Sequence, residues 1–257
     1  MKCVFKDAVV LKKILATLSK ELSLANLMFT PDGLYVNAMN NSHTDMRELS
    51  LKKNFFAQYT CDTSQTIGVS IDILKKFVST AKPQDIVSWT ITDTTIVINI
   101  QEPDENKSCT NWTLKLVELD QENLTIPSDT QWDCHLRIGS ALLKQWISKA
   151  KLLEGNFTMQ VTKDQEILVT VHSDTADVAI AQKIPSVLAH TVQTSETFTT
   201  IAKCISLKEV ECIETLIQCS GGIDICFESE MPLCCTSHLD TESYIRLWIA
   251  PIIGDEE

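Results

Sequence analysis

An amphipathic, lysine-bearing segment recurs four times along the chain, at residues 11–22, 74–81, 142–153 and 207–218. The first leucines of successive segments lie 63, 68 and 65 residues apart, and each segment is followed by a run of short, strand-like pieces. Self-similarity at a fixed period implies one structural unit that is used repeatedly. The chain is therefore expected to fold as a series of similar units.

The spacing of the apolar residues predicts that each segment is a helix. Apolar positions recur every three or four residues, which builds one stripe along an α-helix, and the lysines lie off that stripe. Ser70, Ser140 and Ser206 precede the last three segments, where serine is a favoured N-cap. Ser206 and Glu209 also have the spacing of a capping box.

The sequence between the helical segments has the pattern of β-strands. Short runs rich in β-branched residues, several of them alternating apolar with polar positions, are separated by turn sequences with Pro, Gly and Asp. These runs are residues 33–39, 85–91, 95–100, 157–161, 167–171 and 223–227. Each unit is thus predicted to contain a strand, a helix and several antiparallel strands, in an α+β fold.

The units pair into two halves. The first and third helical segments align at an offset of 132 residues and the second and fourth at 133, so the halves look like duplicates. We expect an N-terminal domain at residues 1–115, a connector at 116–132 and a C-terminal domain at 133–257. The connector is acidic yet carries Leu119, Leu124, Ile126 and Pro127. It either lies extended and offers side chains to a partner, or packs on its own domain.

The distribution of charge differs from its total. The chain has 22 Lys and Arg against 34 Asp and Glu, a formal net charge of −12, which by itself argues against binding to nucleic acid. The first three helical segments nevertheless hold eight lysines and one acidic residue, Glu21. Point charges in a row suit a phosphate backbone and read no base sequence, whereas the alternative is an ordinary solvated lysine face. The candidate DNA-binding residues are Lys12, Lys13, Lys20, Lys75, Lys76, Lys144, Lys149 and Lys151, with Arg246 a weaker candidate.

The fourth segment breaks this charge pattern. It carries Glu209, Glu211 and Glu214 against Lys208 alone. Any contact of this helix with DNA is therefore expected to be the weakest of the four.

No motif of an enzyme or of a metal site is present. The five histidines are scattered without metal-ligand spacing, and no glycine-rich phosphate loop occurs among seven glycines. The ten cysteines include no Cys-x-x-Cys pair, so we interpret them mainly as small buried apolar residues. We expect a protein that is not an enzyme and needs neither metal nor cofactor.

The sequence contains no segment that predicts insertion into a membrane. Residues 9–18 are interrupted by Lys12 and Lys13, too broken for a signal peptide, and no stretch approaches the ~18 apolar residues of a membrane span. Abundant cysteine without a leader fits a reducing compartment. No membrane partner is expected.

Six short sequence motifs stand out for their order and spacing along the chain. They are residues 11–13 (LKK), 39–43 (MNNSH), 61–62 (CD), 124–127 (LTIP), 231–233 (MPL) and 249–257 (IAPIIGDEE). Together they resemble the proliferating cell nuclear antigen (PCNA) family of eukaryotic sliding clamps. The resemblance extends over essentially all 257 residues, with small insertions and deletions.

This resemblance implies a homotrimeric ring around double-stranded DNA, with twelve helices on the inner wall and antiparallel sheets outside. The implied partners are DNA polymerase, clamp loader, flap endonuclease and DNA ligase, in the nucleus or at a viral replication site. Two alternatives stay open, a subunit of a heterotrimeric checkpoint-type clamp and a processivity factor that does not close a ring.

The resemblance also implies two protein-binding sites. The subunit interface would pair residues 109–116 of one chain with 174–180 of the next, using Cys109, Trp112, Leu114, Ala176, Val178 and Ile180. The partner-peptide pocket would comprise Met39, His43, Met46, Leu124, Ile126, Pro232, Trp248, Ala250 and Pro251. The chain departs from the family pattern at Asn40, Thr125 and Trp248, which leaves open a modified peptide preference. Lys163 stands where the family has a lysine that is modified by ubiquitin-like proteins.

Overall fold

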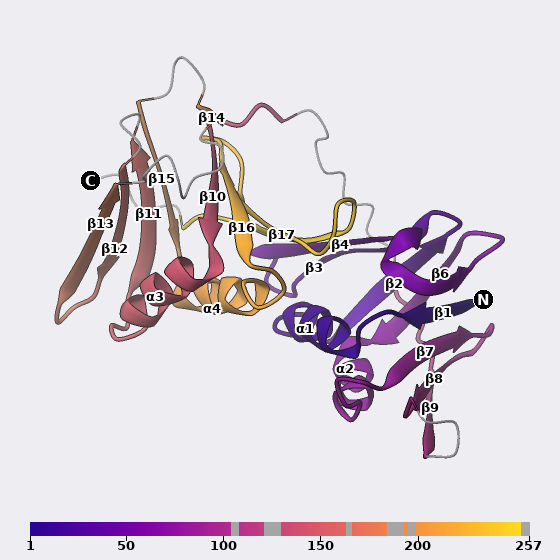
Figure 1. Cartoon of the computed structure of the whole chain (residues 1–257). Helices are drawn as coiled ribbons and strands as arrows, with labels where there is room; N and C mark the ends of the chain where they lie inside the picture. The colour runs from indigo at the N-terminus through magenta and orange to yellow at the C-terminus, as the bar shows by residue number, and fades with distance from the viewer. Residues whose placement is uncertain (104–107, 121–129, 163–165, 184–192, 195–198, 253–257) are drawn as a thin grey trace. The chain divides into compact units, whose positions relative to one another are not determined.

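The computed structural model describes residues 1–103, 108–120, 130–162, 166–183, 193–194 and 199–252. The chain divides into two compact units (Figure 1). Unit 1 comprises Met1–His43, Arg47–Leu124 and Leu239–Ile245, and unit 2 comprises Thr44–Met46, Thr125–His238 and Arg246–Glu257. The short exchanges at residues 44–46 and 239–245 mean that neither unit is one continuous stretch of chain.

Four helices lie within the described residues, as the sequence predicts. They are α1 (Ala8–Leu18), α2 (Ile71–Ser79), α3 (Ser140–Ala150) and α4 (Leu207–Leu216). In unit 1 α1 packs against α2, and in unit 2 α3 packs against α4 (Figure 1). The predicted stripe of α1 is buried, with Leu11, Ile14, Leu15 and Leu18 each at most 2% exposed. The predicted end of this helix is wrong, because α1 stops at Leu18 and Lys20 lies beyond its C-cap.

Two of the three predicted caps are confirmed. The Ser70 hydroxyl accepts a hydrogen bond from the Ile73 N–H at 3.3 Å, and the Ser206 N–H donates to Glu209 Oε2 at 2.9 Å. Each bond satisfies a backbone or cap group that the helix itself leaves unpaired.

The third cap prediction is wrong by one residue. Gly139 occupies the N-cap of α3, and Ser140 is the first helical residue. The Ser140 N–H donates to Gly221 O at 3.0 Å and its hydroxyl donates to Ser220 O at 2.8 Å, so this serine ties α3 to the 220–221 turn.

Unit 1 contains two strand arrangements. One has the order β5 (Phe56–Thr60), β1 (Lys2–Phe5), β7 (Ile86–Ile91), β8 (Thr95–Gln101) and β9 (Cys109–Lys115). The other runs β4 (Asp45–Lys52), β3 (Gly33–Met39), β2 (Leu24–Thr30) and β6 (Gln65–Ser70), and a 3-10 turn, η1 (Lys53–Phe55), follows β4. β8 and β9 pair antiparallel from Thr95↔Lys115 to Gln101↔Cys109.

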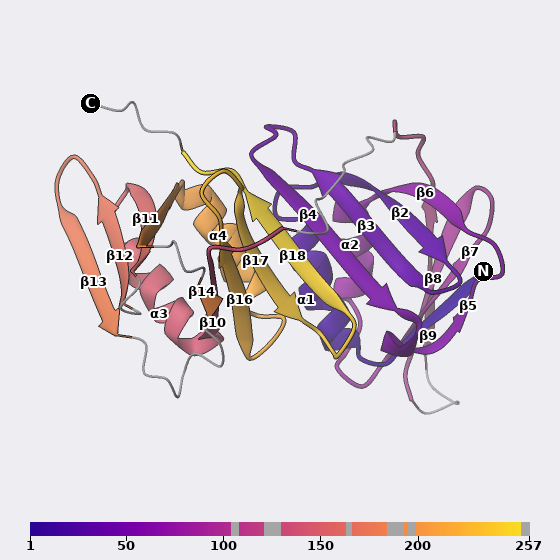
Figure 2. The ribbon, with the colours of Figure 1, turned by 90° about the horizontal axis from the view of Figure 1, so that it is seen from above.

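Unit 2 repeats this plan. One arrangement has the order β14 (Gln193–Thr194), β10 (Cys134–Gly139), β16 (Gly222–Phe227), β17 (Leu233–His238) and β18 (Tyr244–Ile249), and the last three strands lie side by side in Figure 2. The other runs β13 (Asp177–Lys183), β12 (Glu166–His172), β11 (Asn156–Thr162) and β15 (Thr200–Ile205). The predicted α+β fold with two duplicated halves is therefore confirmed.

The two strands predicted to form a subunit interface both lie at the end of a sheet. β9 ends the sheet of β1 and β8, and β13 ends the sheet of β12. The predicted bounds of the second strand are wrong, because β13 begins at Asp177. A turn precedes it, closed by the Ser173 N–H donating to Ala176 O at 3.2 Å, so Ala176 lies in this turn.

A buried cation holds the end of α1. The side chain of Arg47 on β4 is inaccessible to solvent, and its guanidinium donates hydrogen bonds to Thr17 O and to Leu18 O, the latter at 3.1 Å. These carbonyls belong to the last turn of α1, where the helix dipole is negative and carbonyls lack intrahelical partners. Arg47 thus fixes α1 on its sheet.

We predict that Arg47→Leu lowers the free energy of unfolding by about 3 kcal/mol, because it leaves buried carbonyls without donors. Urea denaturation followed by circular dichroism measures the change. Lys53→Leu, at an exposed position in η1, is the matched control and should change stability by less than about 0.5 kcal/mol. Equal effects of the two substitutions would contradict the capping role.

Candidate functional site

The lysines of unit 1 fall into two groups by accessibility. Lys75 and Lys76 on α2 are exposed, as is Lys20 beyond α1. Lys12 and Lys13 are half-buried, and Lys12 Nζ donates a hydrogen bond to Ala81 O after α2. Lys12 therefore joins the two helices as well as adding charge.

The lysines of unit 2 differ in the partners they have. Lys144 and Lys149 on α3 are exposed. Lys151 forms the C-cap of α3, with its Nζ 2.8 Å from Glu214 Oε2 and 3.6 Å from Glu211 Oε1 on α4. The hydrogen bond that Lys151 donates to Glu214 raises the pKa of Lys151 above its ordinary value. The ammonium of Lys151 is thus paired with two carboxylates of α4.

The helix α4 presents less negative charge at its surface than its three glutamates suggest. Glu209 is 7% exposed, because its carboxylate turns back to the backbone of Ser206 in the capping box. Glu211 and Glu214 face Lys151. Each of the three carboxylates therefore has a cationic or hydrogen-bonding partner.

The edge strand β9 presents one aromatic residue that is already packed. Trp112 stacks on Phe77 of α2 with ring centroids 4.7 Å apart and an interplanar angle of 13°. Leu114 is 5% exposed, whereas Cys109 is exposed. Trp112 and Leu114 hence contribute first to the packing of unit 1.

The edge strand β13 alternates along its length. Val178 and Ile180 are half-buried, and their neighbours Asp177, Ala179 and Ala181 are exposed. This is the pattern of a strand that covers its own sheet on one side and leaves the other side open.

Two predicted pocket residues, Met39 and His43, touch each other in unit 1. His43 Nδ1 lies 3.0 Å from Met39 Sδ, and the His43 N–H donates to Asn40 O at 3.0 Å. His43 has φ of 56°, a left-handed backbone conformation that residues other than glycine adopt mainly in tight turns. The turn thereby brings the exposed imidazole back over the end of β3.

Unit 2 brings other predicted pocket residues into an apolar cluster. Cys226, Cys234 and Trp248 form its buried part, and Met46, Trp132 and Met231 pack against them. The rings of Trp132 and Trp248 are 5.8 Å apart, and Trp248 is only 5% exposed. Sequence reasoning missed Trp132 and Met231, although an aromatic residue at the end of an apolar connector was a usable signal.

The remaining predicted pocket residues surround the end of β18 or fall outside the description. Ala250 is exposed and its N–H donates to Thr44 O at 2.8 Å, while Pro232 and Pro251 are half-buried. Leu124, Ile126 and Lys163 lie outside the described residues.

The beginning of the connector packs on unit 1. The Val117 N–H donates to Gly68 O of β6 at 2.9 Å, and a Cβ at position 68 would lie 2.3 Å from Val117 O. Glycine is thus required for this close approach. A cleft of about 500 Å³ runs along the contact, lined in part by Asn26, Glu118 and Leu119. For residues 116–119, packing on the chain's own domain is therefore the observed alternative.

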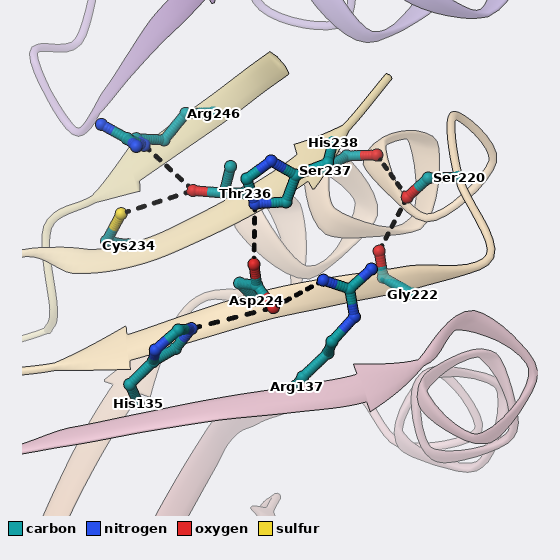
Figure 3. A network of polar contacts seen from close by, with 10 residues as sticks. All are labelled: His135, Arg137, Ser220, Gly222, Asp224, Cys234, Thr236, Ser237, His238 and Arg246. Carbon is teal, nitrogen blue, oxygen red and sulfur yellow. Dashed lines mark hydrogen bonds and ion pairs between the residues drawn. The ribbon is translucent and has the colours of Figure 1, made fainter. Parts of the chain in front are cut away.

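A polar network that sequence reasoning did not find surrounds Asp224 on β16 (Figure 3). His238 Nε2 lies 2.7 Å from Asp224 Oδ2, and Arg137 and His135 lie 3.6 and 3.7 Å from Oδ1. Arg246, proposed above as a weak DNA contact, instead donates from Nε to Thr236 Oγ1 at 2.9 Å on this sheet. Burial raises the pKa of Asp224, but the hydrogen bond with His238 and the nearby His135 and Arg137 side chains together outweigh it and hold this pKa below its ordinary value.

The described residues contain no group of three or more His, Cys, Asp or Glu side chains arranged to hold a metal ion. All ten cysteines are free thiols, and seven of them are buried in their units. In the same part of the chain, no helix has the length and apolarity to cross a membrane.

Comparison with known proteins agrees with the fold. Residues 1–124 match the family model described as the N-terminal domain of proliferating cell nuclear antigen. Proliferating cell nuclear antigen of Chaetomium thermophilum is 26% identical over 255 residues, which cover 98% of each chain. A chain of the PCNA2-PCNA3 complex from Sulfolobus tokodaii superposes with a TM-score of 0.86 at 16% identity, covering 98% of this chain and 99% of the other.

The lowered pKa of Asp224 predicts a specific dependence of stability on pH. The charged carboxylate stabilises the fold above its ordinary pKa of 3.8, and this contribution is lost as the pH falls through the folded value. Wild type should therefore be more stable than Asp224→Asn at about pH 5, and the difference should shrink at about pH 3. Urea unfolding of both proteins measures it, and since all other carboxylates are shared, a difference that stays constant would contradict the assignment.

Proposed function

Because the chain belongs to the PCNA family of sliding clamps, we propose that it closes into a homotrimeric ring around duplex DNA and acts as a polymerase processivity factor. Proteins of this family are scaffolds without enzymatic activity. The observation that carries the proposal is the pair of sheet ends, β9 in unit 1 and β13 in unit 2. The proposed division is residues 1–115, a connector at 116–132, and 133–257.

Ring closure would use the two edge strands. An edge strand presents unpaired backbone N–H and C=O groups, and pairing β9 of one subunit with β13 of the next would satisfy them. Such an interface is heterologous, and three copies close if each turns the chain by a third of a circle. Cys109, Val178 and Ile180 are accessible enough to take part directly, whereas Trp112 and Leu114 would support β9 from within its own unit.

The ring would hold DNA by topology. A closed ring needs only weak, sequence-independent contacts inside it, so that it slides yet stays attached. Lys20, Lys75, Lys76, Lys144 and Lys149 are exposed and suit this role. Lys12 and Lys13 would contribute less because they are half-buried, and Lys151 least because Glu211 and Glu214 hold it.

A hydrophobic peptide pocket would recruit the partners. We place it on Met39, His43 and Met46, the connector residues Leu124 and Ile126, and Pro232, Trp248, Ala250 and Pro251, and add Trp132 from the apolar cluster. Thioethers and large aromatic rings enclose apolar anchors well. The proposed partners are DNA polymerase, clamp loader, flap endonuclease and DNA ligase, and the proposed location is the nucleus.

The mass of the purified chain in solution separates the homotrimer from its alternatives. We expect light scattering at micromolar concentration to give about three times the chain mass of 28.8 kDa. A 28.8 kDa particle would reject a stable homotrimer and favour either a subunit of a heterotrimeric clamp or a factor that does not close a ring.

Neutralising exposed lysines should weaken DNA binding without affecting assembly. The variant Lys76→Gln, Lys144→Gln, Lys149→Gln is expected to bind primed duplex DNA about tenfold more weakly, with a shallower salt dependence, because fewer counterions are released. Fluorescence anisotropy over a salt series measures both quantities, and light scattering checks the mass. Lys53→Gln, an exposed lysine outside the four helices, is the control.

A reciprocal variant tests the assignment of Lys151. Glu211→Gln with Glu214→Gln releases the ammonium and removes two negative charges, so DNA binding should become stronger. Unchanged binding in both this variant and the triple lysine variant would remove the helices from the DNA contact.

A further inference from the structure

Two rows of side chains run across one face of the sheet in unit 2. Along β16, Asp224 and Cys226 point to the same side, because side chains two residues apart share a face. The register places Arg137 and Thr236 opposite Asp224, and His135 and Cys234 opposite Cys226. A polar row and an apolar row are therefore neighbours, about 7 Å apart along the strands.

The apolar row belongs to the cluster of Cys226, Cys234 and Trp248 described above. Arg246 links the two rows, because its guanidinium carbon lies 5.6 Å from the centre of the Trp248 ring while its Nε donates to Thr236. A ligand side chain buried at the apolar cluster would therefore have the polar row within reach of its next residues.

The polar row gathers basic side chains in an acidic chain. Only three arginines occur in the sequence, and two of them, Arg137 and Arg246, lie in or beside this row, with two of the five histidines, His135 and His238, close to it. We call these four residues the arginine–histidine cluster. Three of them, His135, Arg137 and His238, surround the carboxylate of Asp224, which is only 9% exposed, whereas Arg246 bonds to Thr236.

The outer members of the cluster are open to a ligand. The side chains of Arg137 and His238 are 43% and 42% exposed, although both contact Asp224 from opposite strands (Figure 3). Asp224 thus holds both side chains in place beneath, while their solvent sides remain available. Arginine presents a planar set of donors that matches a carboxylate, which a lysine does not.

We propose that the arginine–histidine cluster binds acidic residues that flank the apolar anchor of a partner peptide, so that this protein selects partners with a negatively charged flank. The proposal rests on the peptide pocket of the proposed function and adds the chemistry by which it discriminates among peptides. Charge complementarity supports it, since the cluster is cationic in a chain of net charge −12.

The test uses two labelled peptides with the same isoleucine, phenylalanine and leucine anchors, one followed by Glu-Asp-Glu and its twin by Gln-Asn-Gln. Fluorescence anisotropy with the full-length protein should show about fivefold tighter binding of the acidic peptide at low salt, as expected for a few exposed ion pairs. Arg137→Gln with His238→Gln should remove this preference and leave the affinity for the amide peptide unchanged. Lys53→Gln should keep the preference.

Asp224→Asn provides a second variant with the opposite sign. It removes the negative charge beneath the cluster without changing the size of the side chain, so the preference for the acidic peptide should increase. A purely structural role of the network predicts a loss of binding to both peptides, so an increase specific to one of them distinguishes the two.

The outcomes separate this proposal from the pocket itself. Equal binding of the two peptides by wild type, or a preference that survives in Arg137→Gln with His238→Gln, would overturn the selectivity and leave the pocket standing. Binding of neither peptide, or unchanged binding in Ala250→Arg relative to Ala57→Arg, would reject the pocket and the selectivity with it. If the arginine–histidine variant loses affinity for a duplex oligonucleotide and not for the acidic peptide, the face binds nucleic acid and the proposal is wrong.

Discussion

Burial of one apolar stripe per helix is the constraint on which the other features depend. In α2 the side chains of Ile71, Leu74 and Val78 must leave water, which orients the helix so that Lys75 and Lys76 face solvent. Along a strand, successive side chains point to opposite faces of the sheet, so that residues two apart on β16 share a face. The proposed clamp needs both periods, because its DNA contacts come from helices and its protein contacts from sheets.

Several charged side chains of this acidic chain are paired with neighbouring groups in the fold. The guanidinium of Arg47 donates hydrogen bonds to the carbonyls that end α1, and the ammonium of Lys151 forms an ion pair with Glu214. Asp224 does the reverse, because its carboxylate gathers Arg137 and His238 around it. As a result, a count of charges along a helix or strand overstates what is available to a ligand, and the partners of each ion decide which charges can bind one.

Helices and strands with a strong period could be predicted from the sequence, and their ends could not. Four helices, the strand at residues 33–39 and the capping box at Ser206 were all readable from local spacing. The predicted position of Ser140 was wrong by one residue, because its contacts with the distant 220–221 turn decide where α3 begins. The predicted start of β13 was wrong because a local turn, closed between Ser173 and Ala176, precedes the strand. Trp132 was missed because its partner Trp248 lies more than a hundred residues away.

The sequence by itself determined the duplication, the α+β class and the lysine faces, since these follow from periods of two, about 3.6 and about 65 residues that any reader of the chain can count. Only the tertiary structure decided which charges stay free and which side chains meet. Lys151 pairs with Glu214 on α4, and His135, Arg137 and His238 converge on Asp224 from the two strands that flank β16. The reason is physical: burial and pairing depend on neighbours in space, which the order of residues along the chain does not contain.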